Sequence, residues 1–113
     1  MYTIKDSPVN GKGLFSTQPI KKNIRICDFV GEEMTFKEFN EIYHKDYRFC
    51  YPLMRQHKII NGKDYDNPSR YCNESKTPNV IFKKRGLYTL RDIELDEELF
   101  LRYPSYYPRE YSL

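Results

Sequence analysis

Residues 69–80, with the sequence SRYCNESKTPNV, form a polar segment between two stretches of strand-like sequence. Asparagine, serine and proline at this density are typical of a surface loop. The apolar strands expected on both sides predict instead that the segment lies inside the fold. Any architecture for this chain therefore has to hold a polar segment between short strands.

Short apolar stretches separated by turn residues recur along the chain, and such stretches predict strands. Ile24 and Ile26 are expected on one face of their strand, and Arg85-Gly86 is expected to close a hairpin. An Asn-Gly turn is expected at 61–62. The expected strands are residues 2–5, 13–17, 24–30, 47–53, 57–60, 79–84, 86–90 and 98–103.

One clear helix is expected, at residues 36–44. Thr35 and Glu38 form a capping box, in which a hydroxyl and a carboxylate satisfy free N–H groups of the first turn. Aromatic residues recur at helical spacing and are expected to face the core: Phe36, Phe39 and Tyr43.

Length and composition predict one soluble, mostly β domain spanning residues 1–113. The chain has 113 residues and a mean hydropathy of -0.82. Its 11 tyrosines and 7 phenylalanines argue against disorder. No apolar run approaches the roughly 20 residues of a membrane helix, and no signal peptide is expected at the N-terminus. Lysine and arginine are scattered and the net charge is only +3, which does not favour direct nucleic-acid binding.

The cysteines predict free thiols in an intracellular protein. Cys27, Cys50 and Cys72 are odd in number and far apart, with no Cys-x-x-Cys pair. Only two histidines accompany them. This pattern predicts neither a metal site nor a disulfide framework, and it gives a catalytic cysteine little support.

Several motifs follow one another in a set order: Gly11-Lys12-Gly13, Gly31-Glu32, Arg70-x-x-Asn73-x-Ser75-x-x-Pro78-Asn79, Arg91-Asp92-Ile93, Glu97-Glu98-Leu99 and Tyr103. A Gly-x-Gly alone is a weak signal, whereas the arginine–asparagine block is specific. Over residues 11–103 the series resembles the SET domain, the protein-lysine methyltransferase family. It looks like the minimal form of some large viruses and bacteria, for which neither cysteine-rich flanks nor a zinc-bearing tail is expected.

The resemblance implies a fold of several short-stranded sheets with one short helix. In that fold the asparagine segment and the last strand cross in a knot-like arrangement. The polar segment would lie inside because it binds S-adenosyl-L-methionine, with Asn73 holding the amino-acid end of the cofactor. The residues implied at the cofactor are Gly11, Lys12, Gly13, Leu14, Arg70, Asn73 and Glu74.

The resemblance also implies a lysine channel. Tyr103 matches the family's catalytic tyrosine, and Tyr47 is a second candidate at the reacting groups. Phe82, Leu101, Tyr106 and Tyr107 are candidates for the channel wall, and the tail 104–113 would close the channel without zinc. Neither Phe82 nor Leu101 carries a hydroxyl, so the products are expected to go beyond monomethyl-lysine.

The expected substrate is a protein lysine, first of all in a histone H3 tail that binds extended along a strand edge. The protein would then be intracellular, in the nucleus or a host nucleus, with no membrane partner. A homodimer is also open, because a minimal domain could cover exposed apolar surface with a second copy.

Simpler interpretations stand beside these. Tyr103 could be one more core aromatic, Asn73 a turn former and Ser75 a local cap. Four acidic residues are expected to form a solvated acidic face: Glu94, Asp96, Glu97 and Glu98. The rival function is a catalytically inactive SET fold that serves as a protein-interaction module. It is favoured by Glu74 and Pro104, which stand where the family has histidine and glycine.

Overall fold

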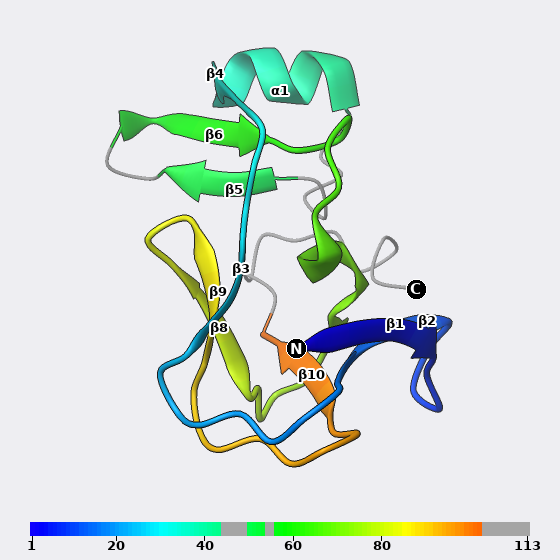
Figure 1. Cartoon of the computed structure of the whole chain (residues 1–113). Coiled ribbons are helices and arrows are strands. Elements are labelled where there is room, and N and C mark those ends of the chain that lie inside the picture. The colour runs from blue at the N-terminus through cyan, green and yellow to red at the C-terminus, as the bar shows by residue number, and fades with distance from the viewer. Residues whose placement is uncertain (44–49, 54–55, 103–113) are drawn as a thin grey trace.

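The computed structural model describes residues 1–43, 50–53 and 56–102, drawn in colour in Figure 1. Of residues 40, 42, 43, 50 and 52 only the backbone is described. The described chain is mostly β with one short α-helix, as the sequence predicted. Its strands form three small sheets, which matches the short, interrupted apolar stretches of the sequence.

The first sheet brings together segments from the beginning, middle and end of the described chain. Its order is β1 (Tyr2–Asp6), β2 (Lys12–Ser16), β10 (Glu98–Leu101) and β7 (Asn73–Glu74). β1 and β2 form an antiparallel hairpin, while β10 runs antiparallel to β2 and parallel to β7. The polar segment 69–80 therefore enters the sheet itself, since β7 belongs to it.

The polar segment then bonds to both edges of β10. On one edge, Ser75 donates its N–H to the Leu101 carbonyl at 2.9 Å. On the other, Asn79 donates its N–H to the Phe100 carbonyl at 3.1 Å. Successive residues of a strand direct their main-chain groups to opposite edges, so the segment passes from one edge of β10 to the other. This is the knot-like crossing that the resemblance implied.

The second sheet has the order β3 (Arg25–Asp28), β9 (Gly86–Thr89) and β8 (Val80–Lys83). β8 pairs Lys83 with Gly86, so the hairpin turn is Lys84-Arg85 and the expected Arg85-Gly86 turn is wrong. Both turn residues have positive φ, +50° and +59°, as a two-residue turn between twisted strands requires.

Neighbouring elements hold this turn in place even though it contains no glycine or asparagine. The Arg85 N–H donates to the Tyr51 hydroxyl at 2.9 Å, and the Arg85 carbonyl accepts from Phe29 N–H at 2.8 Å. The Arg25 guanidinium donates to the Lys84 carbonyl at 3.0 Å. These bonds offset the cost of left-handed backbone at two residues with side chains.

The third sheet has the order β4 (Glu32–Thr35), β6 (Lys58–Asn61) and β5 (Cys50–Leu53), and α1 (Phe36–Tyr43) follows directly on β4. Figure 1 shows α1 lying along this sheet at one end of the molecule, with β1, β2 and β10 towards the other end. The predicted capping box is confirmed. Thr35 N–H donates to the Glu38 carboxylate at 3.0 Å, and Glu38 N–H donates to the Thr35 hydroxyl at 3.1 Å.

Three apolar clusters hold the sheets together. In the smallest, Phe39 of α1 packs on Ile59 of β6, with Phe36 at its border, so this part of the predicted stripe faces the core. A second cluster joins the third sheet to the segment between β3 and β4: Phe29, Tyr51 and Ile60. The largest joins the first two sheets: Leu14, Ile20, Ile26, Cys72, Val80, Leu87, Ile93, Leu99 and Leu101.

Two strand predictions differ from the structure. β4 was not expected, because Glu-Glu-Met-Thr shows no alternation of apolar residues. Ile24 and Ile26 do not share a face: Ile26 is buried, whereas Ile24 is 39% exposed. The pairing of β3 with β9 shifts register between Arg25 and Cys27, and this irregularity breaks the alternation.

Among the described residues, no helix has the length and apolar character needed to cross a membrane.

Candidate functional site

A polar cluster forms where the β1–β2 turn, β7 and β10 meet, and Asn73 is at its centre. The side chain is 7% exposed. Its Nδ2 group lies within hydrogen-bond distance of four oxygens: Ser7 Oγ at 3.2 Å, Asn10 O at 3.1 Å, Lys12 O at 3.3 Å and Glu98 Oε2 at 2.9 Å. An amide nitrogen only donates, so these acceptors fix the orientation of the amide, with Nδ2 towards the turn.

Glu98 is the second buried polar group of the cluster, with 8% of it exposed. Its carboxylate accepts from the Ser7 hydroxyl at 2.8 Å and from Asn73 Nδ2 at 2.9 Å. Ser7 Oγ in turn accepts the N–H of Val9 at 3.0 Å, which ties the turn to the carboxylate. The expectation that Glu98 belongs to a solvated acidic face is therefore wrong.

The two glycines of the turn have separate reasons to be glycine. Gly11 has φ of +47°, and a Cβ there would meet no atom within 4 Å, so its backbone conformation is the constraint. At Gly13 a Cβ would lie 2.5 Å from Glu98 Oε2, so the constraint is the close approach of β2 to this carboxylate.

In Lys12 and Leu14, also predicted at the cofactor, the main chain and the side chain have different roles. Lys12 offers its carbonyl to Asn73, while its ammonium forms an exposed ion pair with Asp6 at 2.6 Å. Leu14 is fully buried in the largest apolar cluster, so its side chain belongs to the core. Only the backbone of Leu14 can therefore face a ligand.

Arg70 and Glu74 flank Asn73 in the chain. Arg70 lies in the 3₁₀ helix η3 (Pro68–Tyr71), where its guanidinium lies over the Tyr71 ring and donates to its hydroxyl at 3.0 Å. Glu74 is half-buried and pairs with Leu101 of β10. Their contact with a cofactor stays a prediction.

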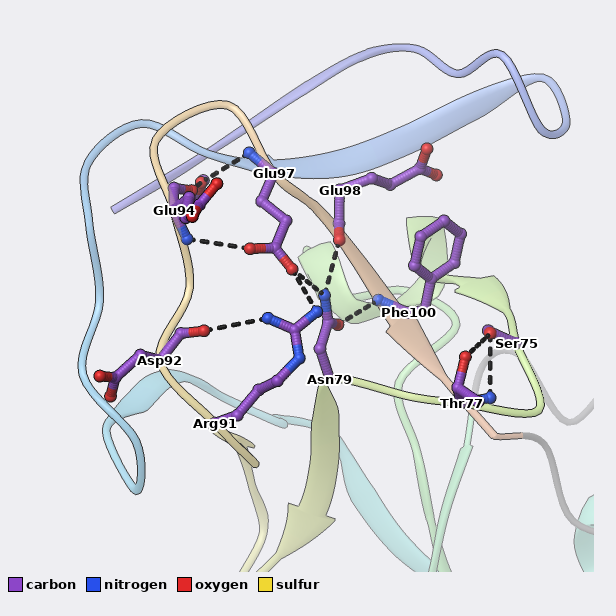
Figure 2. A network of polar contacts seen from close by, with 10 residues as sticks. Ser75, Thr77, Asn79, Arg91, Asp92, Glu94, Glu97, Glu98 and Phe100 are labelled. Atoms are coloured by element: carbon purple, nitrogen blue, oxygen red, sulfur yellow. Dashed lines mark hydrogen bonds and ion pairs between the residues drawn. The ribbon is translucent and has the colours of Figure 1, made fainter.

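A second polar network holds the opposite edge of β10 (Figure 2). Asn79 is 2% exposed, and its side chain donates to the Glu98 carbonyl at 2.8 Å and accepts the Phe100 N–H at 2.7 Å. Its Nδ2 group also reaches the Glu97 carboxylate at 3.1 Å. The amide thus replaces a neighbouring strand along this edge.

Glu97 belongs to the same network, so the expected solvated face is wrong for it too, although Glu94 and Asp96 are exposed. Partial burial acts to raise the pKa of the Glu97 carboxyl. Hydrogen bonds from Arg91, the Glu94 N–H and Asn79, together with the Arg91 charge, outweigh burial and lower that pKa. Glu97 is therefore a structural anion that braces the turn before β10.

The two described channel candidates border one apolar region. Leu101 is buried in the largest cluster, and the half-buried Phe82 packs against that cluster and against the Phe29–Tyr51–Ile60 cluster. The Phe82 ring makes edge contacts with Tyr51 and Phe29, at centroid distances of 5.3 and 5.9 Å. The remaining candidates lie outside the described residues: Tyr47, Tyr103, Tyr106, Tyr107 and the tail 104–113.

The two cysteines whose side chains are described, Cys27 and Cys72, are thiols outside any disulfide, and they are poor nucleophiles. Burial raises the pKa of the Cys27 thiol to about 11, and it raises the pKa of the fully buried Cys72 thiol as well. Both side chains are therefore neutral thiols near pH 7. Within the described ranges, no three histidine, cysteine or acidic side chains come together as a metal site would require.

Sequence reasoning missed Ser7, Asn10 and Glu98 as members of the cluster. Ser7 and Asn10 looked like ordinary turn residues, and Glu98 stands in an acidic run. Strand alternation places Glu98 on the face opposite Leu99, but alternation alone does not reveal that this second face is covered by the turn.

The sequence pattern of the SET domain matches residues 11–104. Histone-lysine N-methyltransferase MEDEA of Arabidopsis thaliana is 31% identical over 88% of this chain. The variant-silencing SET domain-containing protein of Plasmodium falciparum is 28% identical over 88%, and histone-lysine N-methyltransferase Su(var)3-9 of Drosophila pseudoobscura is 26% identical over 91%. The chain spans only 16%, 5% and 20% of these relatives' lengths.

Solved structures agree in fold. The crystal structure of the Chaetomium thermophilum polycomb repressive complex 2 matches 96% of this chain with a TM-score of 0.81 and 22% identity, over 16% of its own chain. The same complex with H3K27me3 and H3K27M matches 96% with a TM-score of 0.79 and 22% identity, over 15% of its own chain. With the sequence match over residues 11–104, these likenesses establish that the chain belongs to the SET domain family.

Proposed function

We propose that this chain is an S-adenosyl-L-methionine-dependent protein-lysine methyltransferase. The observation that carries the proposal is the fixed Asn73 amide. Its Nδ2 is held by oxygens of the turn and β10, and no described residue donates a hydrogen bond to its Oδ1. An oriented acceptor of this kind suits the α-ammonium group of the cofactor.

The remaining cofactor contacts follow from where the cluster lies. The main chain of Gly11–Leu14 borders it, and Gly13 lets β2 lie close to the Glu98 carboxylate. We assign the backbone groups of Gly11–Leu14 to the cofactor. Glu74 follows Asn73 in β7. We assign the Glu74 backbone to the adenine and Arg70 to a position beside the cofactor site. The residues present therefore fit the cofactor that the family uses.

The cofactor supplies a methyl group on a positively charged sulfur, and the protein's work is to align a neutral lysine amine with it. Alignment is the largest contribution, because positioning two reactants can lower a barrier by about 7–11 kcal/mol. We assign Tyr103 and Tyr47 to the amine, Phe82, Leu101, Tyr106 and Tyr107 to the channel wall, and residues 104–113 to its closure.

The proposed partner is a lysine-bearing protein tail, with histone H3 as the first candidate. The relatives named histone-lysine N-methyltransferases support this choice. We further propose that the protein acts inside the cell, in a nucleus if the substrate is a histone. A homodimer stays a prediction. The exposed large apolar side chains are spread along the described chain, and they include Ile4, Val9, Ile24, Ile81 and Leu95.

Replacing Asn73 by alanine tests the cofactor assignment. The change removes the oriented acceptor and leaves buried polar groups without a partner, so cofactor binding is expected to weaken by about 1–3 kcal/mol. Calorimetric titration with S-adenosylmethionine measures this. Ser75→Ala is the matched control, since the Ser75 hydroxyl bonds locally to Thr77. Unchanged affinity in a folded Asn73→Ala variant would contradict the assignment.

The same titration separates the enzyme from an inactive SET-fold module. Cofactor affinity together with mass gain on a lysine peptide establishes the enzyme. A folded wild-type protein that binds no cofactor would favour the module, with Glu74 and Pro104 as the departures responsible.

The Phe82 side chain predicts products beyond monomethyl-lysine. Its ring cannot hydrogen-bond a water that would block rotation of a methylated amine. Phe82→Tyr, or Leu101→Tyr, is expected to shift the product towards monomethyl-lysine. Mass spectrometry of a histone H3 peptide after exhaustive reaction measures this, and a wild-type reaction that stops at one methyl group would show the prediction to be wrong.

A further inference from the structure

Glu97 and Glu98 are neighbours in sequence, but their carboxylates have opposite surroundings. The Glu97 carboxylate forms an ion pair with Arg91 at 2.5 Å, on the side of β10 that holds Asn79. Figure 2 shows the Glu98 side chain pointing away from that network, while its main-chain oxygen accepts from Asn79. The Glu98 carboxylate meets Ser7 and Asn73 instead.

Glu98 has no cationic partner within 4 Å in the part of the chain that the structure describes. The two lysines of the adjoining hairpin are paired elsewhere, Lys12 with Asp6 at 2.6 Å and Lys5 with Asp96 at 3.8 Å. Two neutral donors, a hydroxyl and an amide, satisfy the carboxylate oxygens. Burying a carboxylate without a counter-charge is costly, so a positive charge bound nearby would stabilise this cluster.

We propose that Glu98 determines the ligand specificity of this cluster by favouring a ligand that carries an α-ammonium group. The inference rests on the proposed function, since the ammonium belongs to the methionine part of the cofactor. The distance is short enough for a direct effect. One hydrogen bond of about 2.9 Å joins the carboxylate to Asn73 Nδ2, and a second of similar length would join Asn73 Oδ1 to the ammonium. The ammonium would then lie within about 8 Å of the Glu98 carboxylate.

An uncharged isostere separates this effect from a structural one. In Glu98→Gln the side-chain oxygen can still accept from Ser7 and Asn73, and its amide nitrogen can donate to the Ser7 hydroxyl, so the hydrogen bonds have replacements. The change removes the charge alone. At an intermediate dielectric, losing an attraction over this distance is expected to weaken binding of an ammonium-bearing ligand about tenfold.

The experiment compares two ligands on wild-type and Glu98→Gln protein. S-adenosylhomocysteine carries the ammonium, and its deaminated analogue S-adenosyl-4-thiobutyrate has the same carboxylate and nucleoside without it. Calorimetry measures the first and NMR chemical-shift titration the second. Both ligands carry the carboxylate that Glu98 repels, so the readout is the ratio of the two affinities. Glu98→Gln is expected to lower the preference for S-adenosylhomocysteine over the analogue about tenfold, because only the first ligand loses an attraction.

Asp96→Asn is the matched control. It removes one negative charge from the same segment, its side chain is 70% exposed, and asparagine tolerates its φ of +62°. It is expected to change neither affinity. An unchanged ratio in Glu98→Gln, whether both affinities fall equally or neither falls, would show no charge-specific role and overturn the inference. A wild-type protein that binds neither ligand would overturn the proposed function and this inference with it.

Discussion

Replacing Tyr103 by phenylalanine is expected to lower methyl transfer by about a hundredfold or more while leaving cofactor affinity unchanged. The change deletes one hydroxyl and almost no volume. If that hydroxyl orients the amine and the methyl group, the loss falls on the reaction step, as it does when one oriented donor is removed from an active site.

Single-turnover measurements on a histone H3 peptide, with cofactor titration alongside, separate the two effects. Tyr65→Phe is the control, because it removes the hydroxyl of an exposed tyrosine in the turn after β6. Turnover at the wild-type rate in Tyr103→Phe would mean that another group orients the amine, with Tyr47 as the first alternative to test.

Replacing Asn79 by alanine is expected to lower the free energy of unfolding by about 2–4 kcal/mol. The change leaves the Phe100 N–H and the Glu98 carbonyl without the Asn79 side chain, which bonds both groups along one edge of β10. Each unsatisfied buried polar group costs about 1–3 kcal/mol, and the truncated amide also leaves a space.

Urea unfolding followed by circular dichroism measures this loss. Thr77→Ala, an exposed change in the same segment, is expected to stay within about 0.5 kcal/mol of the wild type. A loss that small in Asn79→Ala would show that water or a neighbouring group replaces the amide on β10.

The sequence predicted the elements whose signals are local. The capping box at Thr35 and Glu38 and the stripe residue Phe39 involve neighbours within one helix turn, so their pattern can be read without knowing the fold. β4 could not be predicted because its pairing with β6 decides its structure, and apolar and polar residues do not alternate along it. The Lys84-Arg85 turn could not be predicted because its own residues disfavour its conformation. Contacts from Arg25, Phe29 and Tyr51 stabilise it.

The candidate site shows the same division. Asn73 stands in a recognisable motif, so it could be named from the sequence. The burial of Glu98 depends on Ser7, which lies 91 residues earlier in the chain and looks like a turn residue. The sequence of an acidic run also does not reveal which of its side chains face water and which face the interior. Glu98 lies in β10, where it pairs with Phe15 of β2, whereas Asp96 lies in the exposed turn before that strand.

The crossing at β10 also sets the order in which a newly synthesised chain can reach its native state. Asn73 and Asn79 leave the ribosome well before residues 98–101, and until then their buried amides have no strand to bond. The N-terminal hairpin also lacks its neighbouring strand until β10 is synthesised, because β2 pairs with β10. Such distant contacts make folding slow and expose intermediates to aggregation. A ribosome-stalled chain ending before residue 98 should therefore remain sensitive to protease across β1, β2 and β7.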